Sequence, residues 1–132
     1  MSDILDQLQM AASGLWVISE TDAALEIVDL GKVEQAGFST NNLLQVLSLP
    51  PDTAIETQEV TYFFRNMTKA REGASEEKIQ EAKRFQELVE LLSRQLKDVK
   101  AYRIGQTRID AYLLGWTNDD QLIGLKTQLV ET

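Results

Sequence analysis

Two hydrophobic patterns alternate along the chain, one with the period of a helix and one with the period of a strand. The N-terminal segment has apolar residues every three or four positions, with Ser2 as a helix cap before them and Gly14 as the expected end. A longer helix is predicted to follow Ser75, because Glu76 and Glu77 favour a helix N-terminus. The two apolar stripes are Ile4, Leu5, Leu8, Ala11, Ala12 and Leu15, and Ile79, Ala82, Phe85, Leu88, Val89, Leu92 and Leu96.

After Asp98 the period changes from 3.6 residues to 2, which is typical of strands. Three such runs, joined by two polar turns, predict an antiparallel meander. The last alternation continues to Val130, two positions before Thr132, although the ends of domains are usually frayed and polar. The three runs are residues 100–105, 108–116 and 122–131, and the turns are residues 105–107 and 117–120.

The middle of the chain has shorter patterns. A polar turn is predicted around residues 19–22, and a strand over residues 24–31. Capping residues and leucines before a proline pair predict a short helix within residues 38–51. We interpret residues 54–56 as a short strand and the segment from about Gln58 as another helix. Helices and strands together indicate an α+β protein with a mainly antiparallel sheet.

Composition narrows the class of protein. With 132 residues, 43% of them hydrophobic, residues 1–132 are expected to form a single domain with a real core. The 21 acidic and 13 basic residues give a formal net charge of −8. An acidic surface repels phosphate, so we expect no direct binding of nucleic acid. The same charge suits a partner with a positively charged site, or simply keeps the protein soluble.

The residue types present also bear on location and chemistry. The N-terminus has no basic segment followed by an apolar run, no stretch approaches the roughly 18 apolar residues of a membrane span, and cysteine is absent. We therefore expect a cytoplasmic protein without membrane contact. The chain also has no histidine, so Ser-His, Cys-His and His-ligated metal sites are excluded within it. Asp119 and Asp120 fit a turn better than a cation site, and we predict neither a cofactor nor an enzyme.

Aromatic residues leave two interpretations open. Trp16, Tyr112 and Trp116 could form a binding surface. Aromatic side chains on amphipathic elements are more often part of a core or its rim. The alternation alone does not choose between these interpretations.

Both ends of the chain carry a set of short motifs that resembles one known family. These motifs resemble the opening helix, the long helix and the closing strands of the nuclease A inhibitor-like family, with matching order and spacing. Residues 29–75 match the family poorly. The motifs are Ser19-Glu20-Thr21, Tyr102-Arg103-Ile104-Gly105, Asp110-Ala111-Tyr112, Gly115-Trp116-Thr117, Leu122-Ile123-Gly124 and Val130-Glu131-Thr132, with the long helix in "KRFQELVELLSRQLKD".

The resemblance implies an α/β/α sandwich and a protein inhibitor of a sugar-nonspecific, magnesium-dependent nuclease of the ββα-metal type. It implies that Thr132 reaches the Mg²⁺ ion of the nuclease and that Glu20 engages a catalytic arginine. The last strand would then present Glu131 and Thr132 to the partner. Trp116 stands where the inhibitor has an acidic residue, and we include it among the expected partner-binding residues.

The chemistry of such a nuclease agrees with these assignments. A phosphodiester-binding cleft offers arginine, which takes a carboxylate as readily as a phosphate, and Mg²⁺, which prefers oxygen ligands. The alternative is a non-catalytic interaction or adaptor module on the same fold, with Trp16 and Trp116 near a different interface.

Overall fold

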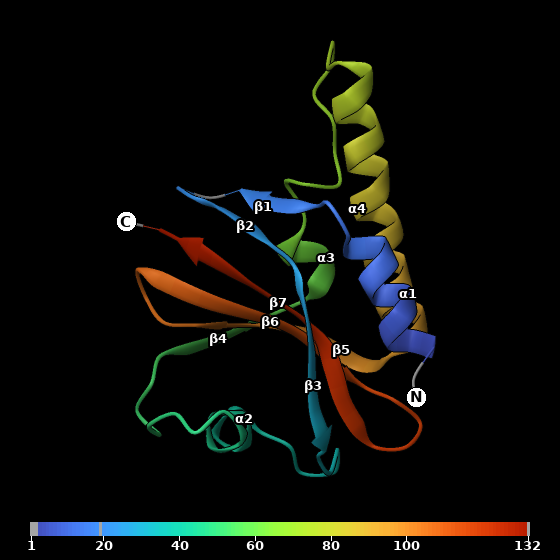
Figure 1. The fold of residues 1–132 in the computed structure, drawn as a ribbon. Coiled ribbons are helices and arrows are strands. Elements are labelled where there is room, and N and C mark those ends of the chain that lie inside the picture. The colour runs from blue at the N-terminus through green and yellow to red at the C-terminus, as the bar shows by residue number, and fades with distance from the viewer. Residues whose placement is uncertain (1–2, 19, 132) are drawn as a thin grey trace.

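A five-stranded antiparallel sheet organises the fold (Figure 1). In the computed structural model, which describes residues 3–18 and 20–131, the strand order is β3-β7-β6-β5-β4. The α+β class and the C-terminal meander predicted from the sequence are confirmed. The strands are β3 (Glu26–Lys32), β4 (Ile55–Gln58), β5 (Lys97–Ile104), β6 (Arg108–Trp116) and β7 (Gln121–Val130).

Helices cover both faces of this sheet. α1 (Asp3–Ala12) and α4 (Glu76–Gln95) pack side by side on one face, and α2 (Thr40–Val46) lies on the other (Figure 1). α3 (Val60–Phe63) is a single turn between β4 and α4. Gln58, where the sequence predicts a helix to begin, is the last residue of β4. The layers therefore form the expected α/β/α sandwich. Within the described residues, none of these helices combines the length and apolarity needed to cross a membrane.

The helix starts follow from local hydrogen bonds. The Ser75 side chain accepts a bond from the Lys78 amide at 3.2 Å, which caps α4 as the sequence predicted. Ser39 and Asn42 form a reciprocal capping box at α2. β5 begins at Lys97, three residues earlier than the predicted run. Only Leu96, the C-cap of α4, separates the helix from β5, and the pairing of β5 with β6 is irregular between Lys97 and Lys100.

Two hydrophobic cores result, one on each face of the sheet. The first lies beneath α1, α3 and α4 and contains most of the predicted helix stripes. The second lies beneath α2 and contains Tyr102, Tyr112 and Trp116. Burial, and secondarily the Asp98 carboxylate, raises the pKa of the Tyr102 hydroxyl above its ordinary value of 10.0. The largest fully buried side chains are Phe64, Phe85, Leu8, Leu15, Leu43, Leu44, Leu88, Leu92, Leu113, Leu114, Leu122 and Ile123.

A small two-stranded sheet forms where the sequence predicted only an apolar run and a turn. β1 (Trp16–Ile18) pairs antiparallel with β2 (Asp22–Ala24). The predicted strand over residues 24–31 is therefore divided, with its start in β2 and the rest in β3. The Thr127 hydroxyl of β7 donates to the Ala23 carbonyl at 3.5 Å, so the hairpin lies against the C-terminal half of β7.

Strands β6 and β7 approach each other very closely at Gly124. A methyl group on Gly124 would lie 1.7 Å from the Leu113 carbonyl oxygen and 3.2 Å from the Leu114 Cα atom. Because both are backbone atoms of the neighbouring strand, no side-chain rotation can relieve the clash. The absence of a side chain at Gly124 is thus required for this pairing.

Candidate functional site

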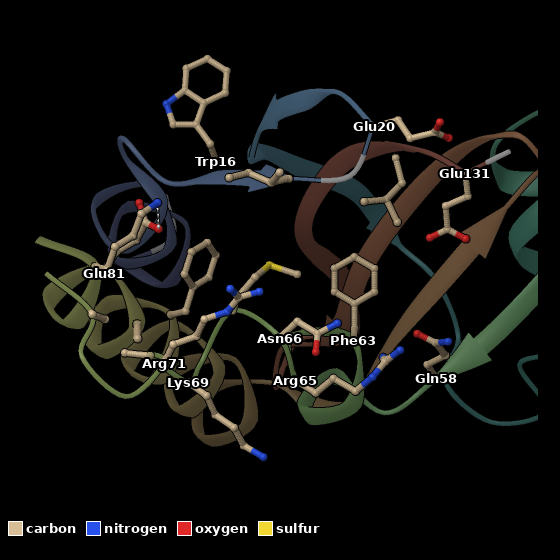
Figure 2. A pocket seen from close by; sticks show the side chains of 18 of the residues that line it. Trp16, Glu20, Gln58, Phe63, Arg65, Asn66, Lys69, Arg71, Glu81 and Glu131 are labelled. Carbon is tan, nitrogen blue, oxygen red and sulfur yellow. Dashed lines mark ion pairs between the residues drawn. The ribbon is translucent and has the colours of Figure 1, made fainter.

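Glu20 and Glu131, which are 111 positions apart, lie at the same end of the molecule. The Glu20 amide donates a hydrogen bond to the Val130 carbonyl at 3.3 Å. The Glu131 amide donates to the Thr107 carbonyl, in the β5–β6 turn, at 2.9 Å. Both glutamates are exposed, and Figure 2 shows them together on one side of a groove. We call Glu20, Val130 and Glu131 the acidic end.

Arg103 holds the Glu131 carboxylate. Its Nη2 atom lies 2.5 Å from Glu131 Oε1, and its Nη1 atom lies 3.2 Å from Glu56 Oε1. The Arg103 side chain is 16% exposed, against 52% for Glu131 and 61% for Glu56. The Nε atom of Arg103 is buried without a hydrogen-bond partner in the described part of the chain. The two carboxylates therefore provide the charge compensation of a largely buried guanidinium.

The groove beside the acidic end has a volume of about 930 Å³ and runs between β1 and the loop before α4 (Figure 2). Its apolar floor contains Phe63, Phe85 and Leu129, all nearly buried. Trp16, which is 52% exposed, stands on the β1 side, and the exposed Arg71 comes from the facing loop. The groove thus combines apolar surface with charges of both signs.

The structure brings together only some of the predicted site residues. Glu20 and Glu131 meet at the acidic end, whereas Thr132 and Ser19 lie outside the described residues. Trp116 is elsewhere, in the core beneath α2, and is 2% exposed. Its indole N–H donates to the Val33 carbonyl at 2.8 Å, and its ring makes an edge contact with Phe38. Because this side chain is covered and its polar atom is satisfied, we do not include Trp116 in the interface.

Arg103 was the residue that sequence reasoning missed as a functional candidate. The sequence shows Arg103 only as part of a motif, although the strand alternation places it on the same face as the buried Ala101. A charged residue on an inward-facing stripe requires a partner of opposite charge. The inward-facing position of Arg103 in the strand pattern is therefore the feature of the sequence that could identify it.

The acidic end is suited to binding another molecule. Among residues 3–18 and 20–131 there is no cluster of three or more acidic side chains able to hold a metal ion. The acidic end offers two carboxylates on a backbone fixed by hydrogen bonds. Such a surface complements an arginine or a metal ion that belongs to another molecule.

The family model described as "Nuclease A inhibitor-like protein" matches residues 2–132, nearly the whole chain. No curated protein matches the sequence.

Proposed function

The chain belongs to the nuclease A inhibitor-like family, and we propose that it inhibits a sugar-nonspecific, magnesium-dependent nuclease by occupying its active site. Glu20 takes the place of a phosphate on a catalytic arginine, and an oxygen atom of Thr132 takes a coordination position on the Mg²⁺ ion of the nuclease. The observation that carries this proposal is the hydrogen bond between Glu20 and Val130, because it ties the two binding elements into one unit.

The physical chemistry of the acidic end supports this mechanism. An arginine that grips phosphate accepts a carboxylate in a bidentate pair, and the overall charge of −8 favours approach to a cationic cleft. Mg²⁺ binds oxygen ligands and keeps exchangeable water molecules, which an incoming oxygen can replace. A segment already fixed to the sheet loses less conformational entropy on binding than a flexible tail.

The direct test is a titration of nuclease activity. A sugar-nonspecific, magnesium-dependent nuclease should lose activity in proportion to added protein, reaching a stoichiometric end point when the nuclease concentration exceeds the dissociation constant. The purified protein alone should show no hydrolysis of DNA or RNA with Mg²⁺ present. An unaffected nuclease would contradict the proposed function, and sustained hydrolysis by the pure protein would contradict a purely inhibitory role.

Deletion of Thr132 should weaken inhibition by roughly 10- to 100-fold, because a metal-bound water would replace an oxygen held in place. The free energy of unfolding should change by no more than about 0.5 kcal/mol, as is usual for surface positions. Inhibition constants and urea denaturation curves measure the two effects. Thr132→Ser is the matched control, because serine keeps the side-chain hydroxyl oxygen and the main-chain oxygen of the residue. This variant should inhibit like the native protein. Equal inhibition by the deleted and native proteins would exclude the metal contact.

A second candidate function is an interaction module for a different partner. Trp16 and Ile18 favour it, because these apolar side chains of β1 are 52% and 59% exposed beside the groove. The sequence had also suggested Trp116 for such an interface, but that side chain is buried. Binding that depends on Trp16 but not on Glu20 would favour this second function.

A further inference from the structure

We propose that Arg103 is a positioning residue, which holds Glu131 and thereby orders the segment that the protein inserts into its partner. This inference rests on the proposed function, but it concerns a residue on the interior face of the sheet rather than one that touches the nuclease. It comes from the two ion pairs of Arg103 and from its partial burial.

The register of the sheet explains how Arg103 reaches the acidic end. Arg103 of β5 pairs with Glu56 of β4 on one side and with Ala111 of β6 on the other. Ala111 is fully buried, and its side chain is a single methyl group. A small residue at that place leaves room for the guanidinium to extend across β6 to the Glu131 carboxylate beyond the end of β7. The contact between Arg103 and Glu131 therefore depends on the length of the arginine side chain and on the small side chain of Ala111.

Two contacts then fix Glu131. Its amide bonds to Thr107 and its carboxylate bonds to Arg103, so backbone and side chain are held at separate points. The backbone bond alone would leave the Glu131 side chain free to rotate and would hold the backbone at one point only. The Arg103 side chain is only 16% exposed, so its charge-assisted bond is screened less than an ordinary surface ion pair.

Glu56 provides an internal comparison. It pairs with the same guanidinium at 3.2 Å, but it comes from the edge strand β4 and carries no part of the acidic end. Loss of Glu56 leaves the Arg103–Glu131 pair in place. If Arg103 positions Glu131, substitution of Glu131 should weaken inhibition and substitution of Glu56 should not. If Arg103 has a purely structural role, the two substitutions should have similar effects on inhibition.

The experiment compares Arg103→Met, Glu131→Gln, the double variant, and Glu56→Gln. Methionine keeps an unbranched chain but removes the charge. Arg103→Met and Glu131→Gln should each raise the inhibition constant about fivefold to tenfold, as expected for loss of one ordered side chain. The double variant should be no weaker than either single variant, because both changes remove the same contact. Glu56→Gln should inhibit like the native protein.

Order at the acidic end is measured separately, without any nuclease. The ¹⁵N heteronuclear NOE of the Glu131 amide should fall in Arg103→Met and in Glu131→Gln, and should stay native in Glu56→Gln. Glu131→Gln alters an exposed side chain, so it supplies the answer even if Arg103→Met folds poorly. An unchanged NOE in a folded Arg103→Met, or losses of inhibition that multiply in the double variant, would overturn the inference. Failure of the native protein to inhibit would contradict the proposed function only, because the NOE tests whether Arg103 positions Glu131 without any nuclease.

Discussion

Glu20→Gln is expected to weaken inhibition by about 2–5 kcal/mol, or roughly 30-fold to 5,000-fold, while leaving the fold intact. The substitution keeps the shape of the side chain and removes its charge. In the complex, the partner arginine would then be buried without its counter-ion, which is the costly part of truncating a charged pair. In the uncomplexed protein Glu20 is exposed, so thermal stability should stay close to that of the native protein.

The matched control for this variant is Glu34→Gln. Glu34 is also an exposed loop glutamate, but it lies between β3 and α2, away from the acidic end. Both variants change the formal net charge from −8 to −7, so any general effect of charge on association is the same in both. Inhibition constants measured at one ionic strength compare them. Equal inhibition by Glu20→Gln and Glu34→Gln would show that Glu20 does not meet the arginine.

Gly124→Ala is expected to destabilise the fold by about 3 kcal/mol or more, at the upper end of the cost of overpacking. The new methyl group would lie 1.7 Å from the Leu113 carbonyl oxygen. Relief requires β6 and β7 to separate, and β7 is an inner strand bonded to β3 on its other side. The melting temperature should fall by roughly 10 °C.

Gly37→Ala separates this steric effect from the general cost of replacing a glycine. Gly37 has a φ of +72°, but nothing lies within 4 Å of an added methyl group. Only the left-handed backbone is strained, at a cost of about 1–2 kcal/mol. Calorimetry or urea denaturation should rank Gly124→Ala as clearly less stable than Gly37→Ala. Equal stability of the two variants would mean that β6 and β7 can separate at Gly124 at little energetic cost.

Local patterns were sufficient to predict most of the fold. The alternation over residues 108–116 matches β6 at both ends, and the Ser75 cap matches the start of α4. Both features depend on side chains within a few positions of each other. The division of the predicted strand over residues 24–31 into β2 and β3 was not predictable in this way, because it follows from packing of the hairpin against β7.

The candidate site required tertiary information. Glu20 and Glu131 were selected through the family resemblance, but nothing in the sequence shows that the Glu20 amide bonds to Val130. For Trp116, the sequence pattern does not show whether the side chain is buried. Its strand alternation permits a core or a surface position, and the covering contacts come from Phe38 and Val33, which are far away in the sequence.

The position of β7 has a consequence for how the protein becomes active. Glu26 of β3 pairs with Lys126 of β7, about 100 positions later in the chain, so closing the sheet requires a very large loop. During synthesis the β5–β6 hairpin can form early, whereas β3 must wait until residues 121–130 leave the ribosome. The same event brings Val130 to Glu20. Nascent chains should therefore remain without inhibitory activity until the last strand enters the sheet, and folding and activation should occur in a single step.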